Sequence, residues 1–164
     1  MLVAVQILAI LLAALSMTAA LGHALEMPGK LRLAQEHYLA VQPIYYPGFT
    51  IGGGLGEIGT IVASAGLALM LPSGSAASSL AWIACASALT VQALYWLLVH
   101  PVNKFWLKDS KVDAASQGFF AIGAGDQAGA DWRALRDRWE RGHAIRAVFA
   151  TLALVLIAAS VAIS

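Results

Sequence analysis

Glu57 is the most conspicuous ionisable residue, because it stands inside a long apolar stretch that begins at Phe49. Along a helix it would lie about 12 Å from that residue, and Thr60 and Ser64 would follow it on the same face. A carboxylate in a water-poor site is a strong base, so Glu57 could remove an acidic C–H proton. Because ionisable side chains within a membrane normally face the interior of a helix bundle, we expect Glu57 to face inward, near Arg146 or a histidine.

Arg146 is the only other charged residue in the chain's long apolar stretches. A purely structural ion pair between Glu57 and Arg146 is the alternative interpretation, since each would otherwise be an unpaired buried charge. Such pairs also occur in active sites, so the pairing would not exclude a function.

Three of the four histidines, His23, His100 and His143, stand at the ends of apolar stretches. In an antiparallel bundle these ends are neighbours, so the three side chains could line one pocket, with Glu57 below them. They are also candidate ligands for a transition metal or a non-covalent haem, whose ligands can come from separate helices. The alternative is that they are solvated helix ends.

Two further patterns place polar and aromatic side chains on helix faces. On the third predicted helix, Gln92, Trp96 and His100 are four residues apart, and Asn103 follows three residues later. On the fourth, one face carries residues at spacings of 4, 3, 4 and 3: Trp132, Arg136, Trp139, His143 and Arg146.

These patterns predict binding and stabilising roles in a site. Asn103 and Arg146 could stabilise developing oxyanion charge, beside His23 and His143 as further catalytic candidates. Trp96 and Trp139 could stack on a flat aromatic substrate. Gln92 and Tyr45 complete the predicted substrate-binding set. For the tryptophans the alternative is an aromatic belt at the membrane interface, formed by Trp96, Trp106, Trp132 and Trp139 with Tyr45 and Tyr46.

The composition indicates what must position these residues. The chain has 164 residues, of which 60% are apolar and 12% are charged, with a mean hydropathy of +0.75. These values exclude a disordered chain, a nucleic-acid-binding domain and a secreted disulfide scaffold, and they predict an integral membrane protein. The single cysteine, Cys85, can form no internal disulfide.

Crossing a bilayer as a helix takes about 20 apolar residues. Four segments qualify, at residues 2–25, 49–71, 79–100 and 142–163. The sequence therefore predicts an all-α integral membrane protein, a single domain over 1–164 that forms an antiparallel four-helix transmembrane bundle. We expect the last helix to begin near Asp131 and to run unbroken into its span. The first segment could instead be a cleaved signal peptide, but its length and the lack of a preceding basic residue favour a retained span.

The basic residues predict the orientation. All ten lie in the connections 26–48 and 101–141 or just inside the last span: Lys30, Arg32, Lys104, Lys108, Lys111, Arg133, Arg136, Arg138, Arg141 and Arg146. By the positive-inside rule these connections are cytoplasmic and both termini lie outside, in what we expect to be the cytoplasmic (inner) membrane of a bacterium.

Three short runs resemble the anthrone oxygenase-like family of small four-span membrane proteins. They extend from His23 to Leu31, from Pro101 to Asn103, and from Trp132 to Arg146. The resemblance implies an oxygenase, since fungal members convert anthrones into anthraquinones with molecular oxygen. The positions it carries over are His23, Glu26, Asn103, Trp139, His143 and Arg146.

The predicted function is that of a membrane oxygenase or oxidoreductase acting with molecular oxygen on a small aromatic or quinol-like substrate near the cytoplasmic face. It would be cofactor-free, with Glu57 or His143 as the base. The alternatives are a haem- or metal-binding redox protein that uses His23, His100 and His143, and a non-catalytic accessory subunit. The expected partners are the lipid bilayer, the aromatic substrate and oxygen; no nucleic acid is expected, and a homo-oligomer remains compatible with the sequence.

Overall fold

The structure is a computed structural model that describes residues 1–107 and 131–164, and its regular elements over these residues are helices. In chain order they are α1 (Leu2–Lys30), α2 (Gln35–Val41), the 3₁₀ helix η1 (Gln42–Tyr45), α3 (Gly48–Met70), α4 (Ala76–Leu94), the π-helical turn η2 (Tyr95–Val99), α5 (His100–Leu107) and α7 (Trp132–Ala162).

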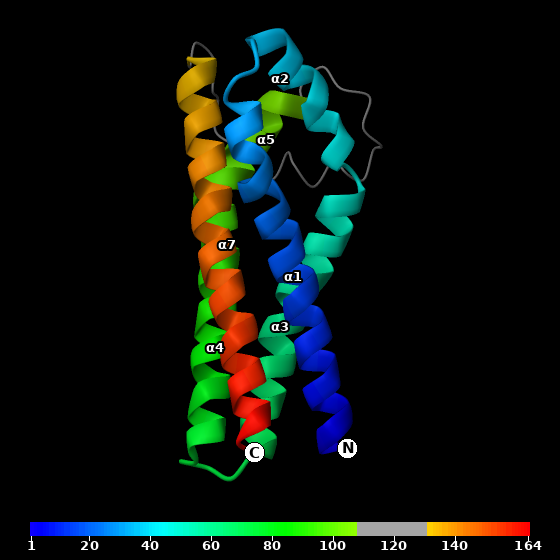
Figure 1. The fold of residues 1–164 in the computed structure, drawn as a ribbon, viewed down its shortest axis with the longest axis vertical. Helices are drawn as coiled ribbons and strands as arrows, with labels where there is room; N and C mark the ends of the chain where they lie inside the picture. Colours follow the sequence, from blue (N-terminus) through cyan, green and yellow to red (C-terminus); the bar gives the residue numbers. More distant parts are fainter. Residues whose placement is uncertain (108–130) are drawn as a thin grey trace.

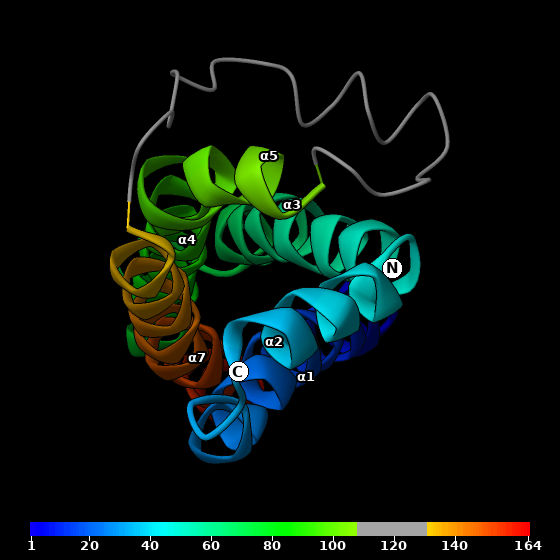
Figure 2. The same ribbon diagram turned by 90° about the horizontal axis from the view of Figure 1, so that it is seen from above.

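Four long helices form an antiparallel bundle, as predicted. Each is long and apolar enough to cross a membrane: α1, α3, α7 and the continuous stretch Ala76–Asn103 that joins α4, η2 and the start of α5. Helix α1 packs on α3 and α7, and α4 packs on the same two helices, so the four form a closed ring in the order α1, α3, α4, α7. Both termini lie at one end of the bundle, and α2 and α5 lie at the other (Figures 1 and 2).

Several helix bounds differ from those predicted. Helix α1 continues to Lys30 with Pro28 inside its last turn, where the proline has no N–H to donate to the carbonyl four residues earlier. The connection 26–48 is largely helical, as α2 and η1. Helix α4 begins at Ala76 rather than at 79, since the Ser75 hydroxyl caps it by accepting from the Ser78 N–H at 3.1 Å.

The third connection also contains helix at both of its ends. Helix α5 continues the third span to Leu107, and α7 begins at Trp132. The Asp131 carboxylate caps α7 by accepting from the Arg133 N–H at 3.1 Å. The prediction of one helix from this point through the last span is confirmed; Lys108 and Lys111 lie outside the described residues.

The two ends of the bundle pack differently. Near the termini the core consists mainly of small side chains, such as Ala13, Ala63 and Ala81 around Leu67 and Ile157. At the other end the core is aromatic: Tyr38, Tyr45, Val99, Val102, Trp106, Leu135 and Trp139. Small side chains let helices approach closely, whereas large rings hold them apart. The helices are therefore drawn together at the terminal end and separated at the aromatic end, where the cavity described below lies.

Candidate functional site

A cavity of about 250 Å³ lies in the aromatic half of the bundle, between α1, η1, α3, the α4–η2–α5 stretch and α7. Its lining includes every residue that the sequence predicted to be catalytic or substrate-binding: His23, Tyr45, Glu57, Gln92, Trp96, Asn103, Trp139, His143 and Arg146. The structure thus brings these side chains to one place; their action on a substrate stays a prediction. Small-molecule sites are commonly concave and mostly apolar, with a few converging polar groups, and this cavity has that character.

Glu57 and Arg146 form a buried ion pair in the wall of the cavity, between α3 and α7. The Arg146 guanidinium Nη2 donates to Glu57 Oε1. The hydrogen-bond partners of Gln92 assign which amide atom is nitrogen and which is oxygen. In that orientation the Gln92 nitrogen donates to Glu57 Oε2 at 2.6 Å, and the Gln92 oxygen accepts from Trp96 Nε1 at 3.2 Å. The expectation that Glu57 faces inward within reach of Arg146 is confirmed, and both carboxylate oxygens are held by donors.

Arg146 also fixes the proton on His143. Its Nη1 lies 3.0 Å from His143 Nδ1, and because a guanidinium has only donors, Nδ1 must be the accepting nitrogen. The imidazole is then neutral and carries its proton on Nε2. Within the described residues this buried Nε2 has no hydrogen-bond partner. His143 therefore offers the cavity a donor, which differs from the basic role considered from the sequence.

His23 lies against His143, with the two ring centroids 4.0 Å apart. The His23 ring also contacts Tyr45 at 4.5 Å, Phe49 at 4.8 Å and Trp139 at 5.0 Å, measured between centroids. Its buried Nδ1 has no partner among the described residues. The two adjoining histidines thus provide polar nitrogens in an otherwise aromatic surrounding.

Trp139 and Asn103 form the wall at the end away from the termini. The indole Nε1 donates to Asn103 Oδ1 at 2.8 Å. Trp139 is only 1% exposed, and Trp106 is also buried. The aromatic-belt interpretation is therefore wrong for these two tryptophans, because belt residues would lie at the lipid interface.

The π turn η2 interrupts the third span beside the cavity, and three of its residues line the wall: Tyr95, Trp96 and Val99. Pro101 has no N–H to donate to the Leu97 carbonyl four residues earlier, and that carbonyl accepts from Arg138 Nη2 at 2.7 Å. A π turn holds more residues per turn than an α-helix, so it shifts the faces on its two sides relative to each other. Gln92, Trp96 and Asn103 line the cavity, whereas His100 is not part of the lining.

His100 contacts Trp96 and Tyr95 instead. Its ring centroid is 4.5 Å from that of Trp96, and its Nδ1 lies 3.3 Å from the Tyr95 hydroxyl. Over residues 1–107 and 131–164, no group of three or more His, Cys, Asp or Glu side chains is placed to hold a metal ion. A metal centre of His23, His100 and His143 thus stays a prediction without support from this geometry.

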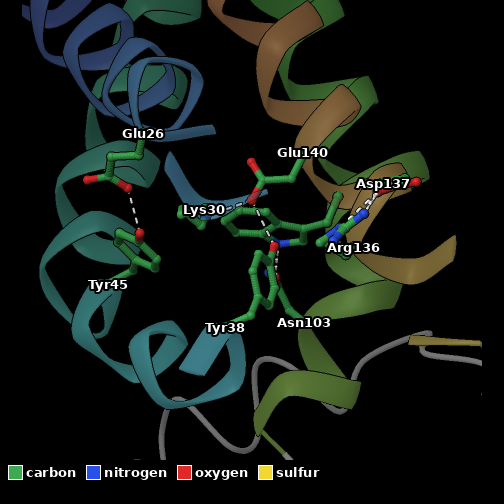
Figure 3. A network of polar contacts seen from close by, with 9 residues as sticks. Glu26, Lys30, Tyr38, Tyr45, Asn103, Arg136, Asp137 and Glu140 are labelled. Atoms are coloured by element: carbon green, nitrogen blue, oxygen red, sulfur yellow. Dashed lines mark hydrogen bonds and ion pairs between the residues drawn. The ribbon is translucent and has the colours of Figure 1, made fainter. Parts of the chain in front are cut away.

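A second buried polar group lies next to the cavity (Figure 3). Glu140 Oε1 accepts from the Tyr38 hydroxyl at 2.8 Å and pairs with Lys30 Nζ at 2.9 Å. The Lys30 ammonium also lies over the Trp139 ring, 4.2 Å from its centroid, and makes a cation–π contact with it. Burial, together with the Glu140 carboxylate, raises the pKa of Tyr38, so the phenol stays a proton donor.

Tyr45 is held in a similar way, where η1 meets the end of α1. Its hydroxyl donates to Glu26 Oε2 at 2.5 Å. Burial first, and then this hydrogen bond, raises the pKa of Tyr45. The ring that faces the cavity is therefore fixed by a carboxylate outside it.

Sequence reasoning missed several residues of this region. Tyr46, Phe49, Thr50 and Tyr95 also line the cavity, and Lys30, Tyr38 and Glu140 form the second polar group. The pair Tyr45-Tyr46 next to Pro47 was the available signal for one cavity wall. The signal for the second group was a lysine and a glutamate that each flank a span on the same side.

Comparison with known proteins gives one match. A family model described as anthrone oxygenase matches residues 49–156, which include Glu57, Gln92, Asn103, Trp139, His143 and Arg146. His23 and Tyr45 lie before the matched residues. Neither the curated proteins nor the solved structures include a match to this chain.

Proposed function

We propose that this chain, which belongs to the anthrone oxygenase family, is a membrane oxygenase that acts on a small, flat aromatic or quinol-like substrate with molecular oxygen. The observation that carries the proposal is the continuous set of contacts from Gln92 through Glu57 and Arg146 to His143 in one cavity. It combines a carboxylate base with hydrogen-bond donors in a mostly apolar cavity between membrane-spanning helices.

The first step is proton removal by Glu57. Each oxygen of a carboxylate has two lone pairs, so Glu57 can accept a substrate proton although Arg146 and Gln92 already donate to it. In a substrate such as anthrone, the proton leaves a ring CH₂ group. The electron pair of the broken C–H bond is delocalised to the ring ketone oxygen, which becomes a phenolate.

Hydrogen-bond donors stabilise that developing charge. The partnerless His143 Nε2–H is the best candidate to donate to the phenolate oxygen, and the Arg146 guanidinium contributes its positive charge. Trp96 offers a ring face on which a flat substrate can stack, and the buried Trp139 forms part of the cavity wall.

The second step is attack on oxygen. The carbanion transfers its electrons to O₂ and forms a C–O bond, and Glu57 returns its proton to the terminal peroxide oxygen. The O–O bond then breaks as the remaining C–H proton is lost, which leaves a ketone and one molecule of water. Substrate CH₂ plus O₂ thus gives C=O plus H₂O, with no external reductant.

Turnover of anthrone by the purified protein tests the proposal. Oxygen uptake should match anthraquinone formation one to one, and Glu57→Gln should lower kcat by about a hundredfold or more because the base is lost. The exposed carboxylate of Glu36 provides a matched control, and Glu36→Gln should behave as the wild type. No turnover by the wild type, or turnover that survives Glu57→Gln, contradicts the proposal.

A visible spectrum and a metal analysis of the same preparation separate this mechanism from the redox alternative. A stoichiometric metal ion or a Soret band, lost on replacement of His23 or His143, would assign these histidines as ligands and would overturn the cofactor-free mechanism.

A further inference from the structure

We infer that the substrate reaches the cavity sideways from the hydrocarbon of the bilayer, through an opening between the N-terminal half of α3 and η2. The residues that mark this opening are Thr50, Gly54 and Ile58 on α3, and Trp96 on η2. The inference rests on the proposed function, because it specifies how the substrate of that same cavity arrives.

The first observation is that cavity-lining residues are exposed on the lipid-facing side of the bundle. Ile58 is 56% exposed and Trp96 is 39% exposed, and both also line the cavity. Where one side chain faces lipid on one side and the cavity on the other, the wall is a single side chain thick, and we place the mouth there. These residues belong to the membrane-spanning segments Gly48–Met70 and Ala76–Asn103, so the mouth opens toward lipid rather than water.

The arrangement of the helices provides the gap. Helix α3 packs on α1 and α4, whereas η2 packs on α4, α5 and α7. In Figure 1 the N-terminal half of α3 leans away from α4 and α7 toward the end that carries α2. Gly54 lies in this half, and a side chain placed on it would meet no atom within 4 Å.

The second observation is that the aqueous end is closed among the described residues. Trp139, Asn103 and Tyr45 form the cavity wall on that side. Beyond them, Lys30 lies over the Trp139 ring and pairs with Glu140, and Tyr38 is fully buried against that carboxylate. A substrate arriving from water would have to separate a buried ion pair, which is costly.

These observations define the class of substrate. The mouth has one hydroxyl, from Thr50, and otherwise presents apolar and aromatic surface. A ligand that passes through it must dissolve in the hydrocarbon core, because a charged group there costs several kcal/mol. The aromatic substrate proposed above is therefore uncharged and lipid-soluble, and carboxylated or sulfonated analogues are excluded.

Matched glycine variants of α3 test the route. Gly54→Leu places a side chain in the mouth, whereas Gly66→Leu makes the same change at an equally open position of the helix outside the cavity. In liposomes, Gly54→Leu should lower kcat/KM for anthrone by about tenfold or more with a smaller effect on kcat, and Gly66→Leu should not. Leucine is the better helix former, so reduced folding does not explain such a loss. Equal kcat/KM values in the two variants overturn the inference.

Cysteine labelling tests the opening without any turnover. Ile58→Cys and Val62→Cys, each made in a Cys85→Ala background, place a thiol at two exposed positions one turn apart, of which only position 58 lines the cavity. Because a thiol in hydrocarbon does not ionise and reacts poorly with a maleimide, a nitroxide spin label is attached to each cysteine in detergent before reconstitution. Anthracene in the liposomes should lower the collision rate of O₂ with the label at position 58 alone, by about threefold or more at saturating occupancy.

Failure of the proposed oxygenase function and failure of the lateral route would give different results. If anthrone is not turned over but anthracene protects the label at position 58 alone, the proposed function fails and the opening stands. If anthracene protects both labels equally or neither, or if a water-soluble paramagnetic reagent collides with the label at position 58 more often than O₂ does, the lateral route is overturned.

Discussion

Glu57 and Arg146 show how two costly side chains can be kept in a membrane. Each is buried, and each satisfies the other, so removing one leaves an unpaired charge in a low-dielectric site. Stability and catalysis depend on this pair in different ways, because folding requires neutrality at the site whereas the proposed reaction requires a carboxylate.

We predict that Glu57→Gln lowers the free energy of unfolding by about 3–5 kcal/mol, and that adding Arg146→Met recovers a large part of the loss, because it removes the orphaned charge. Oxygenase activity should stay absent in the double variant. Thermal unfolding in detergent, followed by circular dichroism, measures the first effect. Additive losses in the single and double variants would show that the two side chains are not coupled.

His143 is predicted to act as a donor through Nε2–H. The amide nitrogen of a glutamine can occupy nearly the same position as Nε2, so His143→Gln should keep a measurable fraction of kcat, while His143→Ala should lose about a hundredfold or more. Steady-state kinetics with anthrone decide between the roles. Equal loss in both variants would favour His143 as the base, since an amide cannot take a proton.

At the scale of elements, the π turn η2 depends on a contact from another helix. Arg138 on α7 donates to the carbonyl of Leu97 that Pro101 leaves without its usual α-helical partner. We predict that Arg138→Met lowers the melting temperature by about 2–4 °C, and by less in a Pro101→Ala background, where residue 101 regains an N–H. A double-variant cycle of melting temperatures measures this; an equal effect in both backgrounds would contradict it.

The crossing of α1 and α3 depends on Gly56. A Cβ at this position would lie 2.6 Å from the backbone nitrogen of Ser16, whereas one at Gly66 would meet nothing within 4 Å. We predict that Gly56→Ala destabilises the bundle by about 1–3 kcal/mol, because neither backbone can yield cheaply. Gly66→Ala should be neutral or slightly stabilising. Unfolding in detergent distinguishes them, and equal stability of the two variants would mean that α1 moves away without cost.

Features that depend on neighbouring residues could be predicted from the sequence, whereas features that depend on contacts with distant residues were missed. Apolar length alone places the four spans, and the rarity of charge in them singles out Glu57 and Arg146. The π turn could not be read from the sequence, because one of the contacts that support it comes from Arg138, about forty residues away. A spacing of four placed His100 on the face of Gln92 and Trp96, whereas in the structure His100 is not part of the cavity lining.

At the scale of the whole molecule, side-chain size along the bundle decides where a cavity can form. Alanine packing near the termini closes one end, and aromatic rings with a buried ion pair cover the other. The sequence pointed to the shared cavity, because the antiparallel order brings helix ends together. The Lys30–Tyr38–Glu140 group was missed, because the first span was predicted at residues 2–25 and Lys30 was assigned to the connection after it.

The last prediction concerns how the bundle sits in the membrane. Lys30, Arg32 and the arginines of α7 from Arg133 to Arg141 lie at the end that carries α2 and α5, whereas the termini and the turn at residues 71–75 have no basic residue. The positive-inside rule then places both termini outside and the aromatic end of the cavity at the cytoplasmic face. A C-terminal alkaline phosphatase fusion should be active, and a fusion after Arg32 should be inactive. The reverse pattern would invert the protein and place the cavity near the outer face, and it would leave the lateral opening toward lipid unchanged.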